Sequence, residues 1–237
     1  MVQLQLGDII IDVEQKNIKN IHLSVYPPDG RVRISAPKRM DLDIIRVYVL
    51  SKLKWIKKQQ AKFINQDREA PREFISRESH YFRGKRYLLK VVEHKAPPKI
   101  ELQHSTIVMY IRPGTPTEKR QRILDEWYRA QLKIAVPQLI EKWEKKMNVK
   151  VNEFGIKKMK TRWGTCNPNA KRIWLNLELA KKPPEYLEYI VVHEMVHLLE
   201  RKHNDIFTAY MDKFMPKWRY YKDGLNRLPV KHEKWNY

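Results

Sequence analysis

His193, Glu194 and His197 form the pattern in this sequence that most directly indicates chemistry. Two histidines four positions apart on a helix project from one face, one turn apart, so both imidazoles can reach a single metal ion. A glutamate directly after the first histidine can take a proton from a zinc-bound water without binding the metal itself. The spacing therefore predicts a zinc ion on His193 and His197, with Glu194 as the catalytic base.

The residues around this pattern, from Tyr189 to Leu199, are almost all apolar. A helix of this composition is buried on most sides, and histidine or glutamate side chains without partners would lose solvation energy there. A bound metal removes that cost. Because Pro183-Pro184-Glu185 provides a helix start, we expect one helix from about residue 184 to 201.

His203 is the candidate third ligand, because it follows His197 by six positions, as in the HExxHxxGxxH zincins. Glu200 stands where those proteins have a glycine that turns the chain, so the helix must end near Arg201 or His203 must begin the next helix. Two alternatives stay open: His203 is an ordinary surface histidine, or a glutamate from a following helix is the third ligand. Asp205 is the only carboxylate close by, and its spacing is poor. Three histidines with an open fourth position are typical of catalytic zinc.

The elements that must position these side chains follow from periodicity and turn residues. We expect a turn at 27–30 and helices over 42–64, from Pro116 onward, and over 205–215. Strands are expected over 21–25, 32–34, 86–92, 100–103, 106–111, 160–166 and 172–177. The pattern predicts an α+β fold with a β-rich N-terminal region carrying one long helix, residues 1–112, and a helix-rich region with one hairpin, residues 113–237. A boundary near Pro113-Gly114 is one reading, and a single continuous domain is the other.

The charge of the chain indicates its partners. Lys and Arg number 48 against 27 Asp and Glu, a net charge of +21, which attracts nucleic acid or nucleotides. The basic residues are dispersed, so a soluble surface without such a partner explains them equally well. Cys166 is the single cysteine, no secretory signal is present, and the longest apolar run is too short for a bilayer. We therefore expect a cytoplasmic protein with no membrane partner, and the sequence indicates no oligomeric state.

Several segments together resemble the YgjP-like family of metal-dependent hydrolases, which is similar to the SprT-like and WLM metallopeptidases. The resemblance covers most of the chain and is carried by Arg162-Trp163-Gly164-Thr165-Cys166, Ile173-Trp174-Leu175-Asn176, His193-Glu194-Met195-Val196-His197, and His203 with Phe207 and Pro216. At Thr165 the family commonly has serine. The resemblance implies a zincin-like core with the HExxH helix beside the 160–177 hairpin. It also implies zinc ligation by His193, His197 and His203, without the glycine of the metzincins.

The leading functional hypothesis is a zinc metallopeptidase that acts on a protein or peptide substrate. In peptidases of this type an edge strand can pair with an extended substrate, and Arg162 or Trp163 could line that cleft. Trp163 can instead pack in the core, and Cys166 is expected to be a small buried hydrophobe. Two alternatives remain: a metal-dependent nucleoside triphosphate pyrophosphatase, and a basic nucleic-acid-associated protein with a structural zinc. Glu194 argues against a purely structural site, which needs no base.

Overall fold

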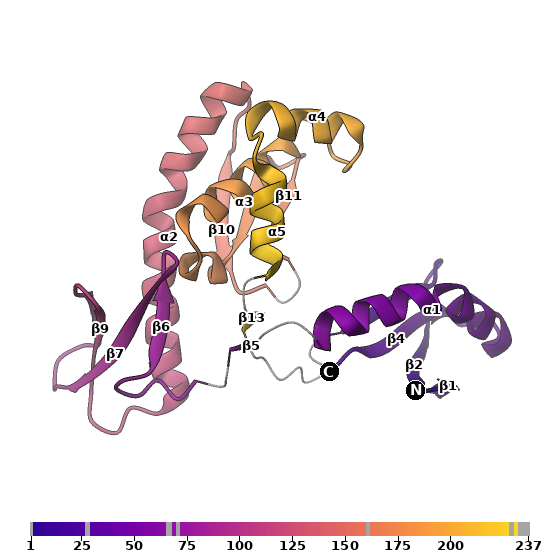
Figure 1. Ribbon diagram of the computed structural model, residues 1–237, viewed down its shortest axis with the longest axis horizontal. Helices are drawn as coiled ribbons and strands as arrows, with labels where there is room; N and C mark the ends of the chain where they lie inside the picture. Colours follow the sequence, from indigo (N-terminus) through magenta and orange to yellow (C-terminus); the bar gives the residue numbers. More distant parts are fainter. Residues whose placement is uncertain are drawn as a thin grey trace. The chain divides into compact units, whose positions relative to one another are not determined.

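The structure is a computed structural model that describes residues 2–26, 29–64, 68–69, 72–159, 162–227 and 230–231 (Figure 1). Contacts divide the chain into two compact units, residues 1–71 with 227–237, and residues 72–226. Both mix helices and strands, so the α+β class is confirmed. Within the described residues, no helix combines the length and apolar character that a membrane crossing requires.

The first unit is a four-stranded sheet covered by one helix. Its strands are β1 (Val2–Leu6), β2 (Ile9–Lys16), β3 (His22–Tyr26) and β4 (Arg31–Pro37), in the order β1-β2-β4-β3. Strands β2 and β4 are parallel and the outer pairs are antiparallel. Helix α1 (Leu42–Ile64) has the bounds that the sequence predicts.

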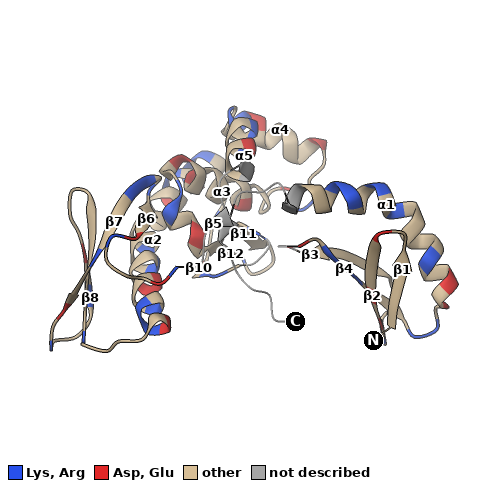
Figure 2. Cartoon of the chain, turned by 60° about the horizontal axis from the view of Figure 1, so that its bottom comes forward, with Lys and Arg blue, Asp and Glu red and all other residues tan. Residues whose placement is uncertain are grey.

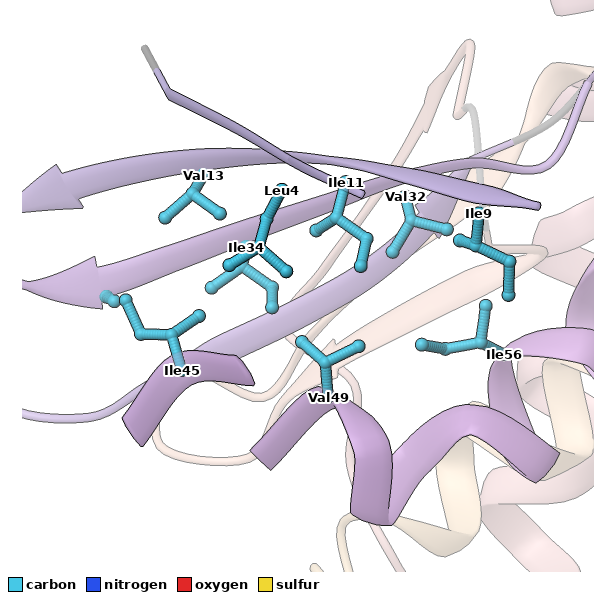
Figure 3. Packing of buried hydrophobic residues seen from close by; sticks show 10 residues of the cluster. Leu4, Ile9, Ile11, Val13, Val32, Ile34, Ile45, Val49 and Ile56 are labelled. Carbon is cyan, nitrogen blue, oxygen red and sulfur yellow. The ribbon is translucent and has the colours of Figure 1, made fainter. Parts of the chain in front are cut away.

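One face of α1 packs on this sheet because its apolar residues recur every three or four positions. Ile45, Val49 and Ile56 are fully buried against sheet residues such as Ile11 and Ile34 (Figure 3). The short strands β5 (Arg68–Glu69) and β13 (Val230–Lys231) pair in parallel. The turn expected at 27–30 lies partly outside the described residues, since Pro27 and Pro28 are not among them.

The second unit begins with another four-stranded sheet. Strands β6 (Ser79–Phe82), β7 (Lys85–Glu93), β8 (Lys99–Leu102) and β9 (Thr106–Ile111) lie in the order β6-β7-β9-β8. These strands pack with the long helix α2 (Thr117–Met147) and with the 3-10 helix η1 (Leu177–Lys181). The compact units therefore divide next to residue 71. From the sequence, a boundary at 112/113 and a single continuous domain were the two alternatives.

The rest of this unit carries the candidate site. Strands β10 (Glu153–Lys157), β11 (Gly164–Asn167) and β12 (Arg172–Asn176) form a sheet in the order β10-β12-β11, with β11 at one edge. Helices α3 (Pro184–Val196), α4 (Asp205–Phe214) and α5 (Trp218–Arg227) follow. Helix α3 packs on β11 and β12, so the HExxH helix lies beside the expected hairpin. Of the strand expected over 160–166, Lys160 and Thr161 lie outside the described residues.

Candidate metal centre

Helix α3 presents its two histidines and its glutamate at its C-terminal end. It begins with Pro184 at its first position and ends at Val196, with His197 as the C-cap. The helix is therefore shorter than the expected one, which reached residue 201. After Val196 the backbone forms turns, in which the N–H groups of Leu198 and Leu199 donate to the carbonyl oxygens three residues earlier. His197 keeps right-handed helical angles, φ −64° and ψ −14°. The four-residue spacing thus still brings His193 and His197 to one face.

The structure brings the three predicted histidines together. His193 Nε2 lies 3.0 Å from His203 Nε2, and one ring nitrogen from each of His193, His197 and His203 lies within 4.8 Å of the others. Tetrahedral zinc with ligands at about 2.0–2.1 Å separates neighbouring nitrogens by roughly 3.4 Å, which falls between these values. The donor set therefore fits one zinc ion with small side-chain movements. Asp205, the rival third ligand, begins α4 and is not part of this cluster.

Phe207 of α4 packs against all three histidine rings of the cluster. Its buried ring lies 5.0, 4.8 and 4.6 Å from the rings of His193, His197 and His203, measured between centroids. The Asn204 side chain accepts the Phe207 N–H at 3.0 Å and caps α4 directly after His203. This turn returns His203 to the helix end without the metzincin glycine. Phe207 had no role of its own predicted from the sequence, although its position four residues after His203 was a usable signal.

Two of the three rings, those of His193 and His197, are favoured in the neutral form that binds a metal. Burial lowers the pKa of His193 to about 3, helped by His197, His203 and Lys222, and burial also lowers the pKa of His197. His197 Nδ1 lies 3.1 Å from the Glu200 carbonyl oxygen, and an N–H there donates to that oxygen. That tautomer leaves Nε2 as the electron-pair donor, which is the usual arrangement around a metal-binding histidine.

Glu194 lies beside this cluster and is almost completely buried, with 5% of its surface exposed. Burial raises the pKa of Glu194 to about 8, and the nearby Arg162 guanidinium partly offsets this effect. The carboxylate packs against the backbone of Gly164: a Cβ at that position would lie 2.6 Å from Glu194 Oε1. Glycine is therefore required there by close approach and not by its backbone angles.

The hairpin and the helices enclose a cleft of about 850 Å³ that contains the histidine cluster. Arg162 and Trp163, the two residues predicted for a substrate cleft, both line it. Trp163 is half-buried, so it is neither a core residue nor fully exposed. Cys166 also lines the cleft, and burial together with Glu194 raises the pKa of its thiol to about 12, which keeps it neutral.

Asn176 anchors the segment directly before β11, which carries Arg162 and Trp163, through hydrogen bonds. Its buried Nδ2 donates to the carbonyl oxygens of Met159 and Arg162, at 2.9 and 2.8 Å, and its Oδ1 accepts the N–H of Met159 and of Glu178. Its backbone N–H donates to the Trp163 carbonyl at 2.9 Å. One buried amide therefore ties the chain before β11 to the end of β12.

The far wall of the cleft was not foreseen from the sequence. Tyr189, Arg201, Lys222 and Leu225 complete the lining, and the last two come from α5. Tyr221 of α5 stacks on Tyr189 of α3, with ring centroids 6.4 Å apart. No helix was predicted after residue 215, although aromatic residues at helical spacing were an available signal there.

Comparison with known proteins finds a match to one protein family. The family model described as the YgjP-like metallopeptidase domain matches residues 19–228. A search of curated proteins found no match. Among solved structures, the crystal structure of the metallopeptidase zymogen of Pyrococcus abyssi abylysin is 21% identical in sequence, with a TM-score of 0.36 over 40% of this chain and 99% of that one.

Proposed function

This chain belongs to the YgjP-like metallopeptidase family, and we propose that it is a zinc-dependent peptidase with Glu194 as its general base. Family membership supports a metal-dependent hydrolase. One arrangement supports the zinc-dependent peptidase in particular: three histidine nitrogens lie within 4.8 Å of one another, and a buried carboxyl group lies beside them in a cleft.

His193, His197 and His203 would hold the ion through one ring nitrogen each. When bound, zinc supplies Lewis acidity that polarises a carbonyl group and makes water a stronger acid. A nearby dication also favours the ionised form of a carboxyl group, which counters the burial that raises the pKa of Glu194. Glu194 can therefore be a carboxylate when the site is loaded.

Glu194 would then move one proton through the reaction. Its carboxylate accepts a proton from the water whose oxygen attacks the peptide carbonyl carbon. The protonated carboxyl group next donates that proton to the amide nitrogen, and the carbon–nitrogen bond breaks to give an acid and an amine. Burial of Glu194 limits the exchange of this proton with bulk water.

Strand β11 offers a way to hold an extended substrate. It pairs with β12 on one side and forms the edge of its sheet within the described residues. A substrate strand could add its main-chain hydrogen bonds to this edge, next to the histidines of α3. Arg162 and Trp163 directly precede β11 and would contact side chains of that substrate.

Hydrolysis assays on the wild-type protein and on two variants test this proposal. We expect zinc-loaded wild-type protein to cleave casein, and Glu194→Gln to lose at least about 10²-fold in rate while it keeps its metal. His197→Ala should lose both metal and activity. Nucleoside triphosphates serve as competing substrates: Glu194-dependent release of pyrophosphate, without casein cleavage, would contradict a peptidase.

A further inference from the structure

The side chains around the candidate metal centre are unusually cationic, even for this basic chain. Arg162, Arg201 and Lys222 line the cleft, and Glu194 is the only carboxylate among its lining residues. The whole chain has fewer than two cations for each carboxylate, 48 against 27, and Figure 2 shows both signs interspersed along its helices. The cleft has three cations for one carboxylate, and that carboxylate is buried.

These three cations come from three separate elements. Arg162 precedes β11, Arg201 follows the turn after α3, and Lys222 lies on α5. All three are exposed, and none forms an ion pair with a carboxylate in the part of the chain that the structure describes. On the same α5, by contrast, Arg219 pairs with Asp212 at 2.5 Å. The three cations of the cleft are therefore free to pair with an anionic ligand.

The charge acts at the reaction centre itself. Arg162, Arg201 and Lys222 line the same cleft as the histidine cluster and Glu194. All three cations therefore border the space in which the scissile bond would lie. Charges of one sign lining a concave site concentrate ligands of the other sign.

We propose that this cleft selects peptides with acidic side chains next to the scissile bond, an inference that rests on the proposed peptidase function. Aspartate or glutamate in the substrate would pair with Arg201 and Lys222, and arginine can hold a carboxylate through two parallel hydrogen bonds. Because exposed ion pairs are weak, each such pair changes kcat/KM by about fivefold at most. Salt weakens the preference, because the three cations are exposed.

The test uses three fluorogenic peptides of equal length, with the residues that flank the scissile bond all acidic, all amide or all lysine. Zinc-loaded wild-type protein should cleave the acidic peptide with the highest kcat/KM and the lysine peptide with the lowest. The preference should shrink at about 0.5 M salt. Arg201→Gln and Lys222→Gln should each reduce it by about fivefold at most, and Lys222→Glu should shift it toward the lysine peptide.

Lys133→Gln is the matched control, because it removes one exposed charge from α2 outside the cleft and should leave the preference intact. Arg162 is left unchanged, since it also acts on Glu194. Equal kcat/KM for the three peptides would overturn the charge selection and leave the peptidase standing. Cleavage of no peptide at all, with or without Glu194-dependent hydrolysis of nucleoside triphosphates, would overturn both proposals.

Discussion

Replacing Gly164 with alanine would place a methyl carbon 2.6 Å from Glu194 Oε1, 2.8 Å from its Cγ and 2.9 Å from its Cδ. Non-bonded carbon and oxygen atoms rarely approach closer than about 3.2–3.4 Å, so the carboxyl group must move by roughly 0.6–0.8 Å. Helix α3 cannot yield easily, because Met195 and Val196 next to Glu194 are fully buried. The displacement therefore falls on the Glu194 side chain.

A displacement of this size should reduce catalysis more than metal binding. A misplacement of about 1 Å in a reacting group can cost about 10²-fold in rate, so we expect kcat of Gly164→Ala to fall by about 10- to 100-fold, or about 1.4–2.7 kcal/mol. Zinc content should stay at the wild-type level, because Gly164 contacts no histidine of the cluster among its nearest atoms. Steady-state peptide hydrolysis and elemental analysis of the same preparation measure both quantities.

A double-mutant cycle on stability isolates the contact. In a Glu194→Ala background all three close atoms are gone, so Gly164→Ala should cost about 1 kcal/mol less free energy of unfolding than in the wild-type background. Urea denaturation of the four proteins gives this difference. Wild-type kcat in metal-loaded Gly164→Ala, or an equal stability cost in both backgrounds, would refute the argument that Gly164 positions Glu194.

Three further predictions concern the stability of the fold. Burial and the nearby Arg72 lower the pKa of His80 to about 3, against 6.5 for the exposed group, so the unfolded chain binds a proton first as the pH falls. The free energy of unfolding should therefore drop by about 2 kcal/mol between pH 8 and pH 5 because of His80. Urea denaturation measures this, and the same pH dependence in a His80→Gln variant would contradict it. Asn176→Ala should lower the free energy of unfolding by about 2–3 kcal/mol, because it leaves buried backbone groups without their partner, and a loss under 1 kcal/mol would speak against its role. Ile45→Ala should destabilise the first unit by about 2–5 kcal/mol without changing zinc content, and loss of metal would show that the site depends on that unit.

The sequence predicted the candidate metal ligands better than the contacts and residues that surround them in the cleft. The spacing of His193 and His197 on an apolar helix defines their geometry locally, and His203 is only six residues further on. The structure accordingly brings all three together. The close approach of Gly164 to Glu194, in contrast, joins residues 30 positions apart, and no local pattern carries such a contact.

Elements with strong periodicity were predicted well and weakly patterned ones were missed. Helix α1 has its expected bounds, because its apolar face repeats without interruption. Strand β10 contains Gly155 in a five-residue segment, and only its parallel pairing with β12 defines it as a strand. Helix α5 follows Pro216 and is rich in polar residues, and its apolar face is defined by Tyr186 and Tyr189 of α3. Tertiary contacts thus determined both elements.

The division of the chain into units also depends on packing over long sequence distances. The sequence change from strands to helix near Pro113-Gly114 suggested a boundary, but β6–β9 and α2 pack together in one unit. A change of secondary structure marks a domain boundary only when the two sides do not share a core.

Metal content of the wild-type protein, Glu194→Gln and His197→Ala tests the central claim most directly. Each protein is purified, loaded with equimolar zinc, dialysed and measured by mass spectrometry for elements. We predict about one zinc ion per chain in the wild-type protein and in Glu194→Gln, and little in His197→Ala, because the proposal makes His197 a ligand and Glu194 the base. Zinc absent from the wild-type protein, or retained in full by His197→Ala, would contradict a zinc centre on His193, His197 and His203.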